Sequence, residues 1–274
     1  MSAKTLSWIL FVAITLAAVF LFNYWASYQP LSTLVYAGAV AALLGIANLA
    51  FPFRFLGVRQ RYVGALVLAG GTLLFFAALS WPAATSRVSQ PRTCLDDVLP
   101  EYQFYERHTV RVHAQPARVL EAVRQSTFGD MTSLSALLKV RAAALRIHDA
   151  ADSLREQRVL DAFVASGFLT GGNEREVVCF GIGNPQARPV LHTVQDFVTY
   201  HGQGAVKMAF NFAVEDSGDG WSTLTAETRV LALDKATSRG MGRYWRLIVP
   251  GSGLLRRQWL DNIRKRAETE TQKG

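Results

Sequence analysis

The sequence predicts an α+β protein in which an N-terminal membrane region precedes a folded polar domain. Three observations lead to this prediction. All 21 acidic residues lie after position 94, so the first third of the chain is basic and otherwise largely apolar. That third holds three uncharged runs, each long enough to cross a bilayer core about 30 Å thick. After it, strand-like alternation and helical periodicity follow each other along the chain, as in domains that combine an antiparallel sheet with helices.

The predicted membrane region covers residues 1–82, with a bundle of three helices at 5–27, 33–53 and 63–82. The first run is longer than the apolar part of a signal peptide and lacks a small-residue cleavage site, so we expect it to be retained. None of the three runs contains Asp, Glu, Lys, Arg or His. Because such residues mark ion and proton pathways in membranes, their absence argues against a pump, a channel or a proton-coupled transporter.

Small residues in the second run have the spacing that allows close helix packing. Gly38, Ala42 and Gly45 recur three to four residues apart. Packing against another helix of the bundle or against a partner subunit would use them. Ordinary membrane composition explains them equally well.

The loops between the runs predict an orientation. The first connection, residues 28–32, is uncharged, whereas the second carries Arg54, Arg59 and Arg61. The positive-inside rule then places the arginine loop and the N-terminus in the cytoplasm. A multi-pass protein of the inner or plasma membrane results, with its C-terminal domain on the extracytoplasmic, periplasmic side. Two arginines after the third run, at positions 87 and 92, argue weakly for the opposite orientation.

The net charge of +8 does not predict a nucleic-acid partner. Six basic residues and no acidic one lie in the first 94 positions, so the remainder of the chain is close to neutral. A nucleic-acid interface would need a basic surface on the folded domain, and the mixed charges of the last helix do not supply one. Membrane lipids, an apolar small molecule, and a membrane-protein partner or a second copy of the chain are the partners expected.

A linker is predicted at residues 83–100, which contain Pro91, Pro100 and no periodicity. A domain over residues 101–270 follows. The expected helices are one that begins at Pro116 and one at 133–146. The expected strands are 103–114, 159–170, 174–183, 190–200, 204–215 and 221–233, with a hairpin turn between the last two.

One long or once-broken helix is predicted over residues 235–268. Asp234 stands where a helix N-cap would, and Leu255, Trp259 and Ile263 form an apolar stripe. Four basic residues lie off that stripe and can face water: Arg256, Arg257, Arg264 and Lys265. The run 250–253 contains a proline and two glycines, so a bend or break is expected there.

This C-terminal pattern resembles that of the START-like or SRPBCC superfamily, whose members include polyketide cyclases. The matching positions are Thr225–Val230, Asp234, Tyr244–Ile248, Pro250–Arg257 and Ala267–Glu268. The resemblance implies a helix-grip domain, in which a curved antiparallel β-sheet wraps around a long C-terminal α-helix. It also implies a cavity for an apolar ligand between the two. It implies no shared catalytic role for any of these residues.

Apolar side chains at alternating strand positions are candidates for the lining of such a cavity, although for each residue taken alone a plain core is the more usual explanation. The candidate ligand-binding residues are Phe163, Phe168, Val178, Phe180, Phe197, Met208, Phe210, Phe212, Tyr244, Trp245 and Ile248.

Motifs that carry catalysis are missing from the sequence. It contains no HExxH, no C-x-x-C and no G-x-S-x-G, so we predict no metal, no cofactor and no catalytic residue. The histidines show no ligand spacing; His108 and His113 are five apart and would lie on opposite faces of a strand. Cys94 and Cys179 are the only cysteines, and either a disulfide or two free thiols fits an extracytoplasmic domain.

These observations lead us to expect an integral membrane protein whose START-like domain binds an apolar or lipid-like ligand near the bilayer surface. A membrane-anchored enzyme similar to cyclases or dehydratases is one alternative. A scaffold or assembly subunit with a filled core is the other. A polar acid–base pair pointing into the pocket would favour the enzyme, and the sequence shows no convincing one; absence of a cavity would favour the scaffold.

Overall fold

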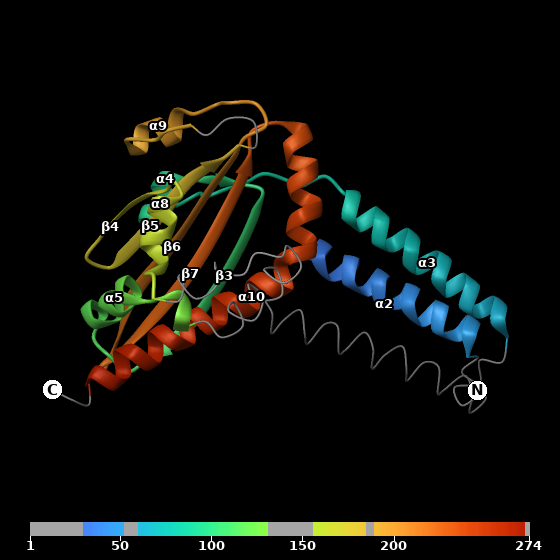
Figure 1. Ribbon diagram of the computed structural model, residues 1–274, viewed down its shortest axis with the longest axis horizontal. Coiled ribbons are helices and arrows are strands. Elements are labelled where there is room, and N and C mark those ends of the chain that lie inside the picture. The colour runs from blue at the N-terminus through green and yellow to red at the C-terminus, as the bar shows by residue number, and fades with distance from the viewer. Residues whose placement is uncertain (1–29, 52–59, 131–155, 185–188, 272–274) are drawn as a thin grey trace. The chain divides into compact units, whose positions relative to one another are not determined.

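Figure 1 shows the computed structural model of the chain, which describes residues 30–51, 60–130, 156–184 and 189–271. The predicted helices at 5–27 and 133–146 lie outside these ranges, so the structure shows two N-terminal helices of the expected three-helix bundle. The described part is α+β: two N-terminal helices, a five-stranded antiparallel sheet and a long C-terminal helix. This confirms the α+β class that the sequence predicted.

The chain divides into two compact units. Unit 1 comprises residues up to Pro82 together with Arg239–Pro250, and unit 2 comprises Ala83–Ser238 together with Gly251–Gly274. Helix α10 (Lys235–Thr271) contributes to both and continues through Pro250 without a break. Of the two alternatives for residues 235–268, the structure therefore has the single long helix, and the boundary between the units falls at the proline.

Unit 1 contains α2 (Pro30–Ala50) and α3 (Arg61–Ser80), close to two of the predicted membrane runs. Both are long and apolar enough to cross a membrane. Their large apolar side chains point outward, as expected of helices that meet lipid rather than a protein core. The exposed ones include Leu43, Ile46, Leu66, Leu73 and Phe76.

Glycines allow the backbones of α2 and α3 to touch. A Cβ atom added to Gly71 would lie 2.5 Å from the amide nitrogen of Ala42 and 2.8 Å from the carbonyl oxygen of Gly38. A Cβ on Gly45 would lie 2.4 Å from the amide nitrogen of Leu68. The small residues of the second run thus serve helix packing within the chain, one of the two readings that their spacing allowed.

Arg246 completes unit 1 by bonding the end of α3. Its guanidinium donates to the carbonyl oxygens of Leu79 and Trp81, each at 2.7 Å. These carbonyls have no partner within the helix, and a cation there also suits the helix dipole. From α2, the Tyr36 hydroxyl donates to the Leu247 carbonyl at 2.6 Å.

Unit 2 is built on one antiparallel sheet with the strand order β3-β7-β6-β5-β4. These strands are β3 (Phe104–Val112), β4 (Leu169–Asn173), β5 (Glu176–Gly183), β6 (Val206–Gly218) and β7 (Trp221–Ala232). The predicted hairpin between β6 and β7 is present. Its turn residues Gly218 and Gly220 have positive φ, which glycine adopts without strain, and Asp219 between them also does, as aspartate can at a single position.

Several segments that were predicted as linker or strand contain short helices instead. The expected linker 83–100 contains β1 (Ser86–Arg87) and α4 (Cys94–Val98), and β1 pairs with β2 (Glu101–Tyr102). The expected strand 159–170 is mainly α8 (Val159–Ala165), and the expected strand 190–200 holds α9 (Val194–Thr199). Helix α5 (Pro116–Gln125) begins at Pro116 as predicted, and a 3-10 turn, η2, follows at Phe128–Asp130.

The sheet carries a separate apolar core on each face. We call the first the inner core; α5, α8 and the C-terminal half of α10 cover it, and its members include Val123, Leu160, Val177, Cys179, Phe210, Phe212, Leu224, Trp259 and Ile263. We call the second the outer core; α4 and α9 cover it, and its members include Leu95, Val98, Val178, Phe180, Phe197 and Ala209. Both faces of the sheet are therefore covered. Successive apolar residues of β5 and β6 point alternately into the inner and the outer core.

Candidate functional site

The predicted ligand-binding residues divide among three places. Phe210 and Phe212 belong to the inner core, Phe163 and Phe168 pack against it, and Met208 shares the strand face of Phe210. Phe210 lies at the centre of this group. Its ring centroid is 4.8 Å from that of Phe163 and 6.2 Å from that of Trp259. The inner core is therefore the part of the prediction that the structure brings together.

The other predicted lining residues do not join this group. Val178 and Phe180 belong to the outer core, because successive residues of β5 point to opposite faces and Cys179 between them faces the inner core. Phe197 of α9 packs with them. Tyr244, Trp245 and Ile248 belong to unit 1. Within unit 2, the sheet therefore separates the predicted lining residues of the inner core from those of the outer core.

Cys94 and Cys179 are free thiols, so the disulfide that was one alternative is not formed. Cys179 belongs to the inner core, whereas Cys94 opens α4 and packs against the outer core. Burial raises the pKa of Cys179 to about 12, so this thiol stays protonated at neutral pH. The two thiols thus lie on opposite faces of the sheet.

A cluster of polar side chains interrupts the inner face of the sheet beneath α10. We call it the Glu106 cluster; it comprises Glu106, His108, Thr228, Ser252 and Arg256. Each oxygen of Glu106 has one partner: Oε1 lies 2.7 Å from His108 Nε2, and Oε2 accepts a hydrogen bond of 2.7 Å from the Ser252 hydroxyl. Both Glu106 and His108 are buried.

Arg256 reaches the same cluster from α10. Its Nη2 donates to Thr228 Oγ1 at 2.5 Å, and Thr228 stands directly opposite Glu106 in the sheet. The guanidinium carbon lies 5.4 Å from the ring centroid of Phe210 and 5.3 Å from that of Trp259, within cation–π range. Burial lowers the pKa of Arg256, and the negative charge of Glu106 partly offsets this.

Arg256 Nη1 is buried and has no hydrogen-bond partner among the residues that the structure describes. This position corrects the expectation that Arg256 faces water. The period of 3.6 places it beside the apolar stripe, close enough to the sheet for its guanidinium to bond Thr228 of β7. A guanidinium is always charged in proteins and is costly to bury without partners.

The sequence contained a signal for this cluster. Glu106 and His108 alternate with exposed residues in β3, on the same side as Phe104 and Val112. A charged residue at an inward position of a strand is rare unless it has a partner, and Glu106 and His108 are each other's partner. In the sequence, His108 was compared only with His113. Its partner Glu106, two residues earlier in the same strand, was therefore not identified.

A second buried polar cluster, on the outer face, holds α4 in place. Glu176 accepts hydrogen bonds from the backbone amides of Cys94 and Leu95 at the start of that helix, at 2.6 and 3.1 Å. Arg229 donates to Asp96 at 2.7 Å and to Glu227 at 2.6 Å. Burial alone would raise the pKa of Asp96, but hydrogen bonds, including one from Arg229, lower it. Because Arg229 is paired with both Asp96 and Glu227, we assign this cluster a structural role.

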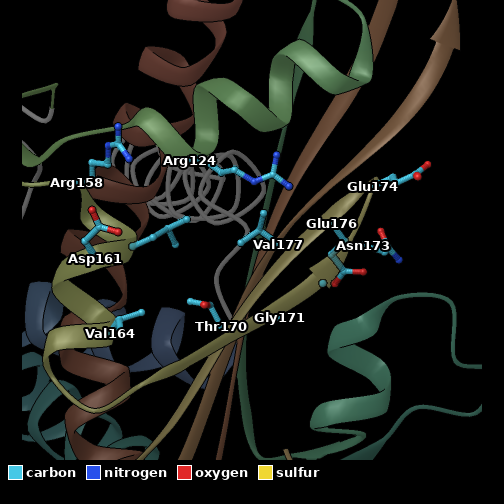
Figure 2. Close-up of a pocket in the computed structure, with 12 residues that line it drawn as sticks. Arg124, Arg158, Asp161, Val164, Thr170, Gly171, Asn173, Glu174, Glu176 and Val177 are labelled. Carbon is cyan, nitrogen blue, oxygen red and sulfur yellow. The ribbon is translucent and has the colours of Figure 1, made fainter.

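A pocket of about 710 Å³ opens at the edge of the sheet, between α5, α8 and β4, as Figure 2 shows. Arg124, Arg158, Asp161 and Glu174 give it a polar rim of both signs. Leu160 and Val177 also line it, and both are members of the inner core. The pocket thus reaches two members of the inner core at the β4 edge of the sheet, whereas Glu106 and His108 lie on β3 at the other edge.

Comparison with family models, with curated proteins and with solved structures gives no match for this chain. Within the described residues, no group of three or more His, Cys, Asp or Glu is placed to hold a metal ion. The inner face therefore has to be interpreted from its own chemistry: an aromatic core, a hydrogen-bonded Glu–His pair and a buried cation.

Proposed function

We propose that this is a membrane-anchored protein whose unit 2 is a START-like, helix-grip domain that binds an apolar or lipid-like ligand. The observation that carries the proposal is the pocket beside β4, part of whose lining belongs to the inner core. Its volume lies within the range of small-molecule sites, about 300–1,000 Å³. A ligand entering there would meet Leu160 and Val177, which pack in the same core as Phe210.

The antiparallel sheet and its covering helix support the helix-grip assignment. Trp259 and Ile263 of α10 pack on the inner face with Phe212, and the ring centroids of Trp259 and Phe212 are 4.6 Å apart. The similarity of the C-terminal sequence pattern to the START-like superfamily points the same way.

The membrane part of the proposal extends to three spans, with the run 5–27 as the first. Two described helices are long and apolar enough to cross a bilayer. The arginine loop between the second and third runs supports an extracytoplasmic unit 2, close to the lipid from which a ligand would come.

Mass spectrometry of lipids retained by the gently purified full-length chain tests ligand binding. Leu160→Trp would fill the pocket next to the core, and Val198→Trp adds the same side chain at an exposed position of α9. We expect a stoichiometric apolar molecule in the wild type and in Val198→Trp, and its loss in a Leu160→Trp protein that still melts cooperatively. No retained molecule, or equal retention in all three proteins, would favour the scaffold alternative.

The enzyme alternative gains one specific observation. Glu106 and His108 form a buried pair 2.7 Å apart on the inner face, which is the arrangement used for proton transfer to or from a substrate. If a ligand is recovered, its incubation with the protein in D₂O provides the test. Incorporation of deuterium at carbon that His108→Gln abolishes would identify an enzyme, and no incorporation would leave a binding protein.

A further inference from the structure

The buried guanidinium of Arg256 has one donor, Nη1, that no acceptor among the described residues satisfies. Thr228 accepts from Nη2, and the rings of Phe210, Phe212 and Trp259 flank the group at 5.3 to 6.0 Å. Nη1 has no exposed surface and no partner among the described residues. Buried donors in native proteins nearly always have acceptors, so an orphan of this kind calls for an explanation.

The neighbouring carboxylate does not satisfy this donor. Glu106 lies close enough to influence Arg256 electrostatically, but the two form no ion pair within 4 Å. Both Glu106 oxygens are already bonded, one to His108 and one to Ser252. The two opposite charges are thus held on the same face of the sheet without direct contact.

The guanidinium of Arg256 places one positive charge beside the aromatic rings of Phe210, Phe212 and Trp259. A ligand that matches both needs an anionic group to accept from the guanidinium and a hydrocarbon part to lie against the rings. The nearby charge of Glu106 disfavours a second negative charge on the ligand, because like charges at short range repel strongly in a poorly solvated site. A singly charged head group fits these conditions better than a dianion.

We propose that Arg256 binds the head group of a singly charged anionic amphiphile, such as a long-chain carboxylate, whose tail lies among Phe210, Phe212 and Trp259. This inference rests on the proposed ligand-binding function and names the chemical class of the ligand. Arg256 would thereby gain the acceptor that the chain's described residues do not provide.

Photolabelling of the full-length chain in phosphatidylcholine nanodiscs tests the proposal. The probes are three C16 chains with the same diazirine in the tail: a carboxylic acid, a primary alcohol and a monoalkyl phosphate. Labelling is quantified by mass spectrometry on peptides from β6, residues 206–218, so that labelling of the membrane helices does not contribute. The variants are Arg256→Met, Arg256→Lys and, as a matched control, Lys265→Met, which removes an exposed cation from the same helix.

We expect the acid to label β6 in the wild type and in Lys265→Met, and to label Arg256→Met at least about ten-fold less, the loss typical of a hydrogen bond between charged groups. Arg256→Lys should restore part of the labelling, since it keeps the charge and loses the planar fork. The alcohol should label β6 weakly, and to the same extent in the wild type and in Arg256→Met. The melting temperature of each variant without probe shows whether it is folded.

Failure of this inference differs from failure of the proposed function. Equal labelling by acid and alcohol in the wild type, unchanged in Arg256→Met, would keep a lipid-binding domain but overturn the role of Arg256. Stronger labelling by the phosphate than by the acid would overturn the preference for a single charge. Absence of β6 labelling by all three probes would overturn both this inference and the ligand-binding proposal. Equal loss of acid and alcohol labelling in Arg256→Met would show that Arg256 has a structural role only.

Discussion

Two adjacent glycines of α3 differ sharply in what surrounds them. A Cβ atom on Gly71 would lie 2.5 Å from a backbone nitrogen of α2, whereas a Cβ on Gly70 would meet nothing within 4 Å. We expect Gly71→Val to separate the two helices and to lower the melting temperature and the monodisperse yield in detergent. Gly70→Val is the matched control and should behave like the wild type. Equal behaviour of the two variants would contradict the packing of α2 on α3.

Trp259 joins α10 to the inner core. It is 5% exposed, contacts Phe210 and Phe212, and donates from Nε1 to the Ser126 hydroxyl at 2.8 Å. Trp259→Ala should lower the free energy of unfolding by about 3–5 kcal/mol, the usual cost of removing a large core aromatic. Leu254→Ala, at an exposed position of the same helix, should cost less than about 0.5 kcal/mol. Urea titration followed by near-UV circular dichroism measures both; similar losses would place Trp259 outside the core.

Asp234 is the N-cap of α10, as its position in the sequence predicted. It accepts hydrogen bonds from the Thr237 hydroxyl and amide and from the Gly204 amide, at 2.6, 2.9 and 2.8 Å. These bonds lower its pKa to about 2. Since a free aspartate has a pKa of about 3.9, the stabilisation is complete above roughly pH 4 and is lost as the pH falls toward 2.

Comparison of Asp234→Ala with the wild type across pH tests this. At pH 7 we expect the variant to melt at a lower temperature, and the difference to shrink as the pH falls from about 4 to 2. Asp234→Asn retains a capping oxygen without the titration. A difference between wild type and Asp234→Ala that is independent of pH would show that the charge of Asp234 does not stabilise the fold.

At the scale of elements, α4 shows how a five-residue helix is held. Thr93 accepts from the Asp96 amide, and the Asp96 carboxylate accepts from the Thr93 amide, which forms a capping box. Glu176 of β5 accepts from two further amides of this helix. Because isolated helices of this length are unstable, α4 depends on these contacts.

The position of α4 predicts where unit 2 can be cut. A fragment of residues 83–274 retains β1 and the complete cap, whereas a fragment of residues 95–274 lacks Thr93 and the Cys94 amide that bonds Glu176. We expect the longer fragment to melt cooperatively and at the higher temperature by circular dichroism. Equal melting temperatures would mean that the cap of α4 adds nothing to the stability of unit 2.

Local sequence rules predicted the elements that local interactions determine. The apolar helices α2 and α3, the start of α5 at Pro116 and the β6–β7 turn follow from length, proline and glycine chemistry. The helices α8 and α9 were predicted as strands because they are short and rich in Val, Phe and Thr, which favour strands. A capping box at Thr193 and Asp196 stabilises α9 against that preference.

The candidate site was less predictable, because it is assembled across the sheet. Glu106 and Thr228 are opposite each other in the register of β3 and β7, and Arg256 joins them from a helix that follows both strands. The periodicity of β3 alone would have placed Glu106 and His108 on one face. The approach of Arg256 depends on how α10 lies on the sheet, which no local pattern specifies.

At the scale of the whole molecule, the charge of the loops remains the basis for the orientation of the chain. The loop 54–62 carries three arginines and the connection 28–32 carries none. Arginine and lysine near membrane spans are retained on the cytoplasmic side, so three spans would leave residues 95–274 outside. Alkaline phosphatase is active only outside the cytoplasm. A fusion after residue 274 should therefore be active, and one after residue 57 inactive. The reverse pattern would show that the arginines at positions 87 and 92, rather than the loop, determine the orientation.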